Sequence, residues 1–166
     1  MDLKDYIRSI KDYPKKGILF RDITTLIKNE TAFEESINQI VERSKKFKID
    51  KIAAIESRGF VFASAVSYIL KKPFIMLRKK NKLPADVHSV DFELEYGTAT
   101  IEVHKDSISE NDSVLIIDDL IATGGTAEAA AKLVEISKGN IAAFIFVINL
   151  FDLGGCDNLL KKGYKV

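Results

Sequence analysis

The chain is organised around the stretch Val114-Leu-Ile-Ile-Asp-Asp-Leu-Ile-Ala-Thr-Gly-Gly-Thr126. Its first four residues are apolar and three of them are β-branched, and so short an apolar run predicts a buried strand of a parallel sheet. Asp118 and Asp119 end the run, and the glycine pair after them precedes a helical pattern. The stretch therefore predicts a strand, a tight loop and the N-terminus of a helix.

The predicted loop has the chemistry of a phosphate site. The first N–H groups of a helix lack partners and the helix dipole favours an anion. The glycine pair has no side chains, so the main chain can approach a phosphate closely, and Thr123 and Thr126 add hydroxyl donors. The two acids precede this loop, and carboxylates accept hydrogen bonds from vicinal hydroxyls and attract a hydrated metal ion. The implied ligand is a sugar phosphate with a diol near its anomeric carbon.

A simpler interpretation is an ordinary strand–turn–helix, in which an Asp caps the helix and the glycines make the turn. The combination of an apolar strand, two acids, Ala-Thr-Gly-Gly-Thr and a helix favours phosphate binding over that interpretation. The P-loop pattern G-x-x-x-x-G-K-[ST] and the dinucleotide pattern G-x-G-x-x-G are both missing from the sequence. A P-loop NTPase and a Rossmann dinucleotide enzyme are therefore not supported.

Composition narrows the class further. A length of 166 residues fits one domain, expected to span residues 1–166. The 25 basic and 24 acidic residues nearly cancel, which argues against a nucleic-acid partner. The longest apolar run, residues 141–148, is too short to span a bilayer, so no membrane partner is expected. The single Cys156 excludes an internal disulfide and a cysteine metal cluster, and fits a reducing cytoplasm.

Four further segments show helix or strand patterns. Helical spacing within residues 2–12 predicts a short amphipathic helix, and a capping-box pattern from Thr31 predicts a helix over 31–47. A strand over 49–55 ends in Glu56-Ser-Arg-Gly59, and a helix over 60–71 follows. The loop of this second unit again offers backbone donors, here with a cation, although a surface turn with a solvated Arg is the simpler interpretation.

Alternating strands and helices predict an α/β fold with a mostly parallel five-stranded sheet and flanking helices. In chain order, the strands are expected at residues 51–55, 74–78, 113–118, 141–148 and 164–166. The loops after the first and third strands can flank one crevice if those strands are neighbours, which gives the order 2-1-3-4-5. Residues 83–98 show no sustained period, and a loop of that length is typical of an active-site lid that a strand at 98–104 completes.

Three stretches resemble a known family. Ile116-Ile-Asp-Asp-Leu-Ile-Ala-Thr-Gly-Gly-Thr126 resembles the phosphoribosyl-pyrophosphate (PRPP) motif of type I phosphoribosyltransferases. Asp12-Tyr-Pro-Lys-Lys-Gly-Ile-Leu-Phe-Arg-Asp-Ile-Thr24 and Leu94-Glu-Tyr-Gly97 are similar to segments of the adenine-specific branch of that family. The similarity covers nearly the whole chain. It implies the type I phosphoribosyltransferase fold, with a small N-terminal hood at about residues 1–30 and a flexible lid hairpin at about 79–104.

The resemblance also implies a reaction, in which adenine and PRPP give AMP and pyrophosphate with Mg²⁺ bound mainly through PRPP rather than in a protein cage. A cytoplasmic homodimer is expected. The implied residues are Glu95, Asp118 and Asp119 for catalysis, Ala122, Thr123, Gly124, Gly125 and Thr126 for the 5-phosphate, Ser57, Arg58, Gly59, Arg78 and Lys82 for pyrophosphate, and Phe20, Arg21 and Tyr96 for adenine.

Some of these assignments have simpler interpretations. From the sequence alone, Phe20 is best interpreted as a core residue and Arg21 as an exposed charge beside it. The resemblance instead implies that this segment holds the base, with the aromatic ring stacked on it. Lys79 and Lys80 are interpreted as a solvated part of the basic run. A non-proline cis peptide is expected between Glu56 and Ser57, because in the family this loop often holds pyrophosphate through one.

Two alternatives to the adenine enzyme remain open. One is a phosphoribosyltransferase for another purine, which the Phe20-Arg21 and Leu94-Glu-Tyr96 segments argue against. The other is a PRPP-sensing regulatory module that keeps the phosphate loop without catalysis. The near-zero net charge and the presence of Glu95 favour an enzyme.

Overall fold

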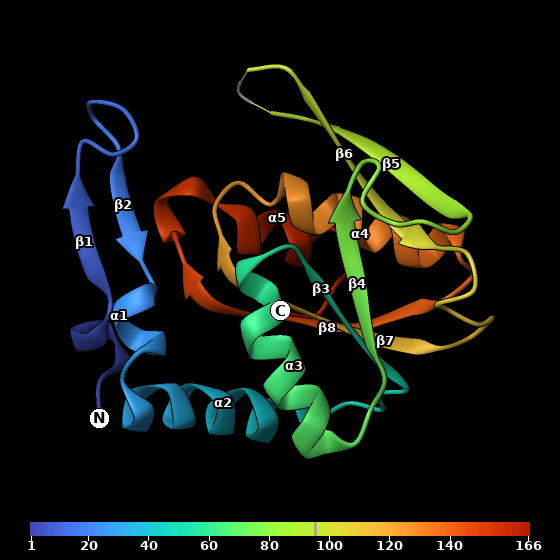
Figure 1. Cartoon of the computed structure of the whole chain (residues 1–166), viewed down its shortest axis with the longest axis horizontal. Coiled ribbons are helices and arrows are strands. Elements are labelled where there is room, and N and C mark those ends of the chain that lie inside the picture. The colour runs from blue at the N-terminus through green and yellow to red at the C-terminus, as the bar shows by residue number, and fades with distance from the viewer. Residues whose placement is uncertain (95) are drawn as a thin grey trace. The chain divides into compact units, whose positions relative to one another are not determined.

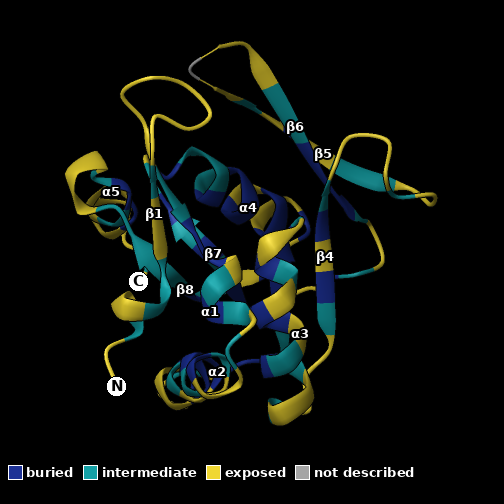
Figure 2. Cartoon of the chain, turned by 60° about the vertical axis from the view of Figure 1, so that its left-hand side comes forward, coloured by how far each residue is buried: buried dark blue, intermediate teal, exposed yellow. Residues whose placement is uncertain are grey.

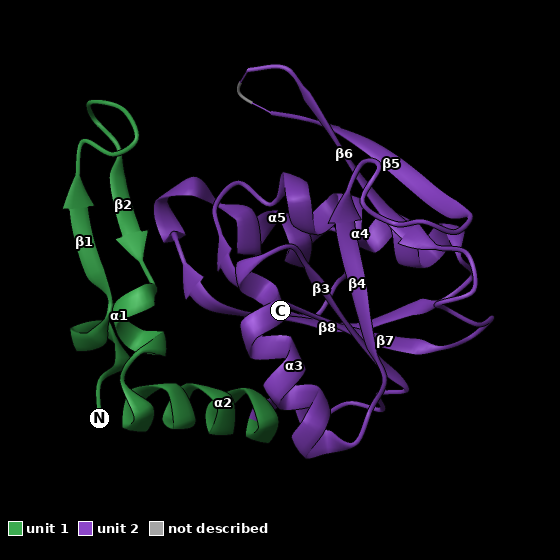
Figure 3. Ribbon diagram, in the orientation of Figure 1, with its two compact units in different colours: residues 1–42 green, residues 43–166 purple. Residues whose placement is uncertain are grey.

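A computed structural model of the chain describes residues 1–94 and 96–166 (Figure 1). The predicted proton-exchange residue, Glu95, lies outside the described residues. The chain divides into two compact units, residues 1–42 and 43–166, coloured separately in Figure 3. The first unit extends past the expected hood segment, and each unit is described by itself below.

The second unit contains a six-stranded sheet with the order β5-β6-β4-β3-β7-β8. Its strands are β3 (Lys51–Ile55), β4 (Phe74–Lys79), β5 (Val87–Glu93), β6 (Thr98–His104), β7 (Ser113–Ile121) and β8 (Asn140–Asn149). β3, β4, β7 and β8 are parallel, whereas β6 runs antiparallel to β4 and β5 runs antiparallel to β6.

The predicted order of the first four parallel strands is confirmed, because β3 lies between β4 and β7 and β8 follows β7. The predicted strand count of five is wrong. The hairpin β5–β6 joins the sheet at the edge of β4 through the pairs Arg78↔Glu102 and Lys79↔Ile101. Residues 164–166 form no strand, since only one ladder-like bond is present, from Phe144 N to Lys165 O at 2.8 Å.

Helices cover the sheet in the second unit. α4 (Gly125–Ile136) contributes buried alanines and leucine to a core that includes Ala53, Leu77 and Ile116 from alternate positions of three strands. α3 (Arg58–Leu70) packs against β3 and β7, and the strand residues between those core positions are also buried. Figure 2 shows this burial as dark blue along β7 and α4. Strands buried on both faces explain why β3 and β7 read as continuous apolar runs.

Two shorter elements end the second unit. The 3₁₀ turn η2 (Phe151–Leu153) follows β8, and α5 (Gly155–Lys161) follows at once. Tyr164 then packs its ring edge-on against Phe144, with the ring centroids 5.5 Å apart. Its hydroxyl donates to Glu135 at 2.7 Å, so the C-terminal segment is bound to α4.

The first unit holds a two-stranded antiparallel sheet, β1 (Arg8–Lys11) with β2 (Leu19–Asp22). The 3₁₀ turn η1 (Leu3–Tyr6) precedes it, and α1 (Thr24–Ile27) and α2 (Glu30–Ser44) follow. The predicted helix within residues 2–12 is therefore wrong, because pairing with β2 overrides the helical spacing of its apolar residues.

α2 corresponds to the predicted helix over 31–47, but its cap differs from the predicted one. Ala32 N donates to Asn29 Oδ1 at 2.9 Å, so the capping side chain comes from Asn29 rather than from Thr31.

Candidate active site

A cavity of about 810 Å³ lies within the second unit, at the carboxyl ends of β3 and β7. Its lining includes the loop after β3, the loop after β7 and apolar side chains from the hairpin, namely Phe92, Leu94, Ala99 and Ile101. The carboxyl ends of neighbouring parallel strands at a topological switch point are where ligands bind in open α/β sheets. The structure therefore brings the two predicted phosphate loops to one cavity.

Asp118 and Asp119 both line this cavity. β7 continues to Ile121, where it pairs with Asn149 of β8, so the strand runs beyond its predicted end at residue 118 and both acids lie within it. Asp119 N donates to Asp118 Oδ1 at 2.9 Å. Pairing with the long strand β8 on one side holds both acids on a regular backbone.

The two acids differ in their surroundings. Arg58 Nε lies 2.7 Å from Asp119 Oδ2, and the Asp119 side chain is only 8% exposed. Burial, followed by the charge of Asp119, raises the pKa of Asp118 to about 8. Asp118 therefore keeps its proton to a higher pH than an ordinary aspartic acid does.

The loop after β3 approaches the acid pair closely. The predicted cis peptide between Glu56 and Ser57 is present. A Cβ at Gly59 would lie 2.7 Å from Asp118 Oδ1 and 3.2 Å from Ile117 O, so only glycine leaves room for that carboxylate. Ser57 and Arg58 line the cavity, and this places three predicted pyrophosphate residues beside the acids.

The basic residues after β4 are arranged differently from the sequence interpretation. Glu56 Oε1 accepts a hydrogen bond from Lys79 N at 2.6 Å and lies 3.4 Å from Arg78 Nε. Arg78 therefore reaches the site through Glu56, and Lys82 is exposed and does not line the cavity. Lys79 and Lys80, interpreted above as solvated, do line it. The predicted strand ended at residue 78, whereas β4 continues to Lys79. A prediction that carried the strand one residue further would have placed these two lysines at its carboxyl end, where the cavity lies.

The loop after β7 has the geometry of an anion site. Gly124 has a φ of 95°, and α4 begins at the next residue. This left-handed conformation favours glycine, and it precedes the first helical N–H groups. Residues 122–126 all line the cavity, so the five predicted 5-phosphate residues lie together.

The predicted adenine residues Phe20 and Arg21 lie on β2 in the first unit, and Tyr96 is an exposed residue of the second. The Phe20 ring meets the Tyr13 ring edge-on, with centroids 5.1 Å apart. Arg21 donates from its guanidinium to Ser9 Oγ, across the β1–β2 pair.

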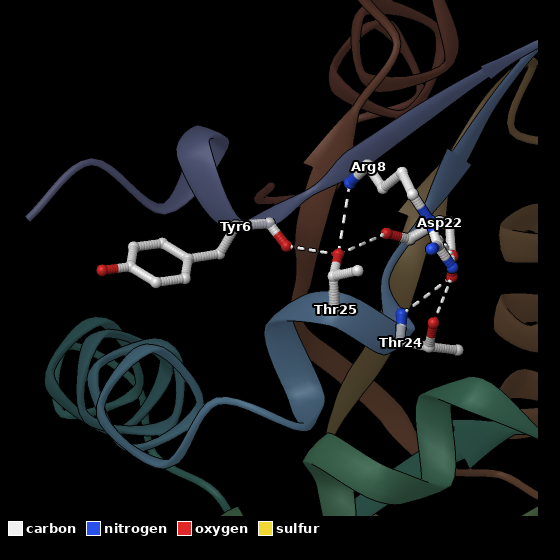
Figure 4. A network of polar contacts seen from close by, with 5 residues as sticks. All are labelled: Tyr6, Arg8, Asp22, Thr24 and Thr25. Carbon is white, nitrogen blue, oxygen red and sulfur yellow. Dashed lines mark hydrogen bonds and ion pairs between the residues drawn. The ribbon is translucent and has the colours of Figure 1, made fainter.

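A polar network fixes the residue after Arg21 (Figure 4). Asp22 is 7% exposed, and its carboxylate accepts from Thr24 N at 2.9 Å, from Thr24 Oγ1 at 2.7 Å and from Arg8 Nε at 2.9 Å. These hydrogen bonds, from Thr24 first and then Arg8, lower the pKa of Asp22 to about 2.

Thr25 extends the same network. Its hydroxyl donates to Tyr6 O at 2.6 Å and accepts from Arg8 N at 3.2 Å. Together these bonds tie β1, β2 and α1 to one another, so the backbone of β2 is held firmly.

Two possible features were searched for in the described part of the chain. No group of three or more His, Cys, Asp and Glu side chains in residues 1–94 and 96–166 is arranged to hold a metal ion. None of the helices formed by those residues is long and apolar enough to cross a bilayer.

Comparison with known proteins identifies the family. Residues 22–154 match the phosphoribosyl transferase domain. Over 166 residues the chain is 86% identical to the adenine phosphoribosyltransferase of Pelagibacter ubique (strain HTCC1062), covering 100% of this chain and 95% of that protein. The chain belongs to the adenine phosphoribosyltransferase family.

Solved structures of family members agree with this fold. The adenine phosphoribosyltransferase of Thermoanaerobacter pseudethanolicus is 46% identical with a TM-score of 0.94, over 98% of this chain and 94% of that one. The Saccharomyces cerevisiae enzyme, solved with adenine and an imino-altritol bisphosphate, is 36% identical with a TM-score of 0.89, over 95% and 92%. The family assignment therefore rests on both sequence and structure.

Proposed function

We propose that this protein transfers the 5-phosphoribosyl group from PRPP to adenine, giving AMP and pyrophosphate. The observation that carries the proposal is the single cavity shared by the acid pair, the glycine loop after β7 and the Ser57–Arg58 loop. Those three parts match the diol, the 5-phosphate and the pyrophosphate of PRPP. The adenine bound in the structure of the yeast relative supports the choice of base.

The proposal orients PRPP by its two charged ends. Main-chain N–H groups and hydroxyls of residues 122–126 bind the 5-phosphate. Ser57, Arg58 and Gly59 bind pyrophosphate, with Arg78 and Lys82 as further proposed contacts and Lys79 and Lys80 supported by their position on the cavity. An anion fixed at both ends leaves the anomeric carbon between them, which favours attack by lowering the entropic barrier.

Asp118 and Asp119 are proposed to hold the ribose hydroxyls. As pyrophosphate leaves, the ring gains positive character like that of a glycosyl oxocarbenium ion. A carboxylate placed beside that charge stabilises it most in the transition state, which is the condition for a gain in rate. The Arg58 ion pair keeps the Asp119 side chain in one place for this purpose.

The base is proposed to bind at Phe20, Arg21 and Tyr96, with the Phe20 ring stacking on the purine. Support comes from the network around Asp22, which holds the backbone of β2 and so fixes the main-chain groups that read the base edge. Glu95 is the proposed partner for the proton that adenine loses when N9 becomes glycosylated.

Mg²⁺ is the proposed cofactor. Carboxylate oxygens suit this hard cation, and Asp118 and Asp119 offer them at the cavity. Because Asp119 is already paired with Arg58, the donor set fits a cation held mostly by substrate oxygens. When bound, the ion neutralises charge on the leaving pyrophosphate.

The proposal includes a homodimer in the cytoplasm. Val61 and Tyr68, seven residues apart on one face of α3, are exposed, with Tyr68 86% exposed, and Ile69 lies beside them. An exposed apolar patch of this kind fits a second copy of the chain. The free Cys156 fits a reducing compartment. Sedimentation of the wild type and of Tyr68→Lys tests the dimer.

A coupled assay with PRPP, Mg²⁺ and adenine, hypoxanthine or guanine in turn tests the function. Adenine is expected to exceed hypoxanthine in kcat/KM by up to about 10⁴, because a site that pairs the 6-amino group leaves polar groups unpaired with a 6-oxo base. A kcat/KM for another purine comparable to that for adenine would show that the enzyme is not specific for adenine. PRPP binding without turnover would indicate a sensing module. Asp119→Asn should lose activity, and Asp106→Asn, an exposed acid outside the cavity, should keep it.

A further inference from the structure

The loop after β7 rests on the segment that follows β8. Three successive carbonyls accept hydrogen bonds from that segment, the first at the end of β7 and the next two in the loop. Leu150 N donates to Ile121 O at 3.0 Å, and Gly155 N donates to Ala122 O at 3.0 Å. The Asn158 side-chain amide donates to Thr123 O at 3.4 Å.

This pattern has a geometric consequence for the N–H groups of the loop. The cis peptides in the described residues are at Tyr13–Pro14 and Glu56–Ser57, so the peptides after Ile121, Ala122 and Thr123 are trans. In a planar trans peptide, the C=O and the N–H point in opposite directions. Since the three carbonyls face the segment 150–158, the three N–H groups that follow them point away from it. The segment thereby sets the direction of the donors proposed to bind phosphate.

Gly155 makes the close contact at the centre of this support. A Cβ at position 155 would overlap the carbonyl oxygen of Ala122 and lie 2.7 Å from Ile121 Cγ1 and 3.0 Å from Gly124 N. A Cβ at Gly124 would in turn lie 3.3 Å from Gly155 Cα. The two glycine backbones are therefore in contact, and neither has room for a side chain. Gly155 also lies one residue beyond the matched family region, which ends at residue 154.

We infer that Gly155 is a positioning residue for PRPP, because its bare backbone supports the loop at residues 122–124 from behind. This inference rests on the proposed function, since it takes the loop to be the 5-phosphate site. Gly155 contacts no substrate in this assignment. Its effect passes through the direction of the loop N–H groups, so it should change affinity for the phosphate end of PRPP and leave the purine end unaffected.

The test compares Gly155→Ala with Gly139→Ala. Alanine has a higher helix propensity than glycine, so α5 by itself would tolerate the change at position 155. Gly139 is the control because it follows the end of α4 away from the loop, and a Cβ there would lie 2.8 Å from Ile108 Cγ2 and 3.0 Å from Val134 Cγ1, both side-chain atoms outside the loop. In both variants the new methyl group would be crowded by its neighbours, but only in Gly155→Ala would it press on the phosphate loop.

The readouts are the KM values for PRPP and adenine, and calorimetric binding of ribose 5-phosphate. For Gly155→Ala, the KM for PRPP and the dissociation constant of ribose 5-phosphate should rise by about 10- to 100-fold, since displacements near 1 Å can cost that much. The KM for adenine should stay within about twofold in the same comparison. Unchanged PRPP values, or an equal rise in Gly139→Ala, would overturn the inference.

Asn158→Ala keeps the inference testable if Gly155→Ala does not fold. Removing one amide-to-carbonyl bond should raise the KM for PRPP by about two- to fivefold, with no such change in Lys161→Ala on the same helix. Equal KM values in both variants would reject the supporting role of the segment. Lack of turnover by the wild type with adenine and PRPP would instead reject the proposed function. The inference about Gly155 would still be tested in that case, because ribose 5-phosphate binding can be compared among the variants without turnover.

Discussion

Arg58 Nε lies 2.7 Å from Asp119 Oδ2, and this ion pair joins the first turn of α3 to β7. The two elements carry the proposed pyrophosphate loop and the proposed ribose acids. The pair thus fixes the distance between two parts of the cavity that must hold one substrate. Its Arg side chain is 49% exposed, so the pair contributes more to site geometry than to stability.

Replacing Arg58 should therefore separate catalysis from folding. Arg58→Ala should lower kcat/KM for PRPP by about 100-fold, since it removes a pyrophosphate contact and frees Asp119. The free energy of unfolding should fall by no more than about 1–3 kcal/mol, the cost of leaving the nearly buried Asp119 without this partner. Arg58→Lys should recover only part of the activity, because Lys lacks the planar fork of donors. Parallel denaturant and kinetic measurements check this, and a large stability loss with normal kinetics would contradict it.

Asp118 should make stability depend on pH. Its pKa is raised to about 8 in the folded protein, above the usual value of 3.8, so the folded state holds a proton there that the unfolded state has lost. Stability from this group therefore falls as the pH rises from about 4 to about 8. Asp118→Asn should be more stable than the wild type at pH 8–9, and the difference should shrink toward pH 4. Melting temperatures across this range check the sign, and a constant difference would contradict the protonation argument.

Asp22 should show the opposite dependence. Its pKa is lowered to about 2 in the folded protein, so its stabilising effect is complete above the unfolded value of 3.8 and is lost as the pH falls through about 2. Asp22→Asn should be less stable than the wild type at pH 7, with the difference vanishing near pH 2. Asp106→Asn serves as the control for loss of an exposed charge. Asp22→Asn should also raise the KM for adenine more than the KM for PRPP.

Glu95 should act in the chemical step. Glu95→Gln keeps the size of the side chain and loses its proton acceptor, so the single-turnover rate should fall by about 10²–10⁴ with PRPP binding little changed. Rapid-quench measurement is required, because product release can limit steady-state turnover and hide the effect. A single-turnover rate close to that of the wild type would remove Glu95 from the mechanism.

Local patterns predicted the part of the fold that depends on local interactions. The β7–loop–α4 unit, the unit after β3 and the order of four parallel strands all follow from apolar runs, glycines and two loops that must meet. Partners far along the chain decide the rest. Pairing with β2 makes β1 a strand, although its apolar residues have helical spacing. Pairing with β6 and packing against α4 make β5 a strand, although its own sequence pattern is weak.

The same distinction applies to the site. The acid pair and the loop at residues 122–126 were predictable because each lies on one continuous stretch. The cavity positions of Lys79 and Lys80 depend on how far β4 runs, which is set by its pairing with β6. The role inferred for Gly155 depends on a contact with a loop about thirty residues earlier, for which spacing along the sequence holds no signal.

Val90, Ile101 and Val103 are buried, and they join the base of the β5–β6 hairpin to the main core. If the hairpin swung outward as a rigid body, these side chains would be exposed to water, at a free-energy cost of about 1.5–3 kcal/mol each. A hinge at the edge of β4 is therefore energetically unfavourable. The described strands of the hairpin, up to Phe92 and from Ala99, should therefore act as a fixed wall beside the cavity, so that substrates enter past them rather than by displacing them.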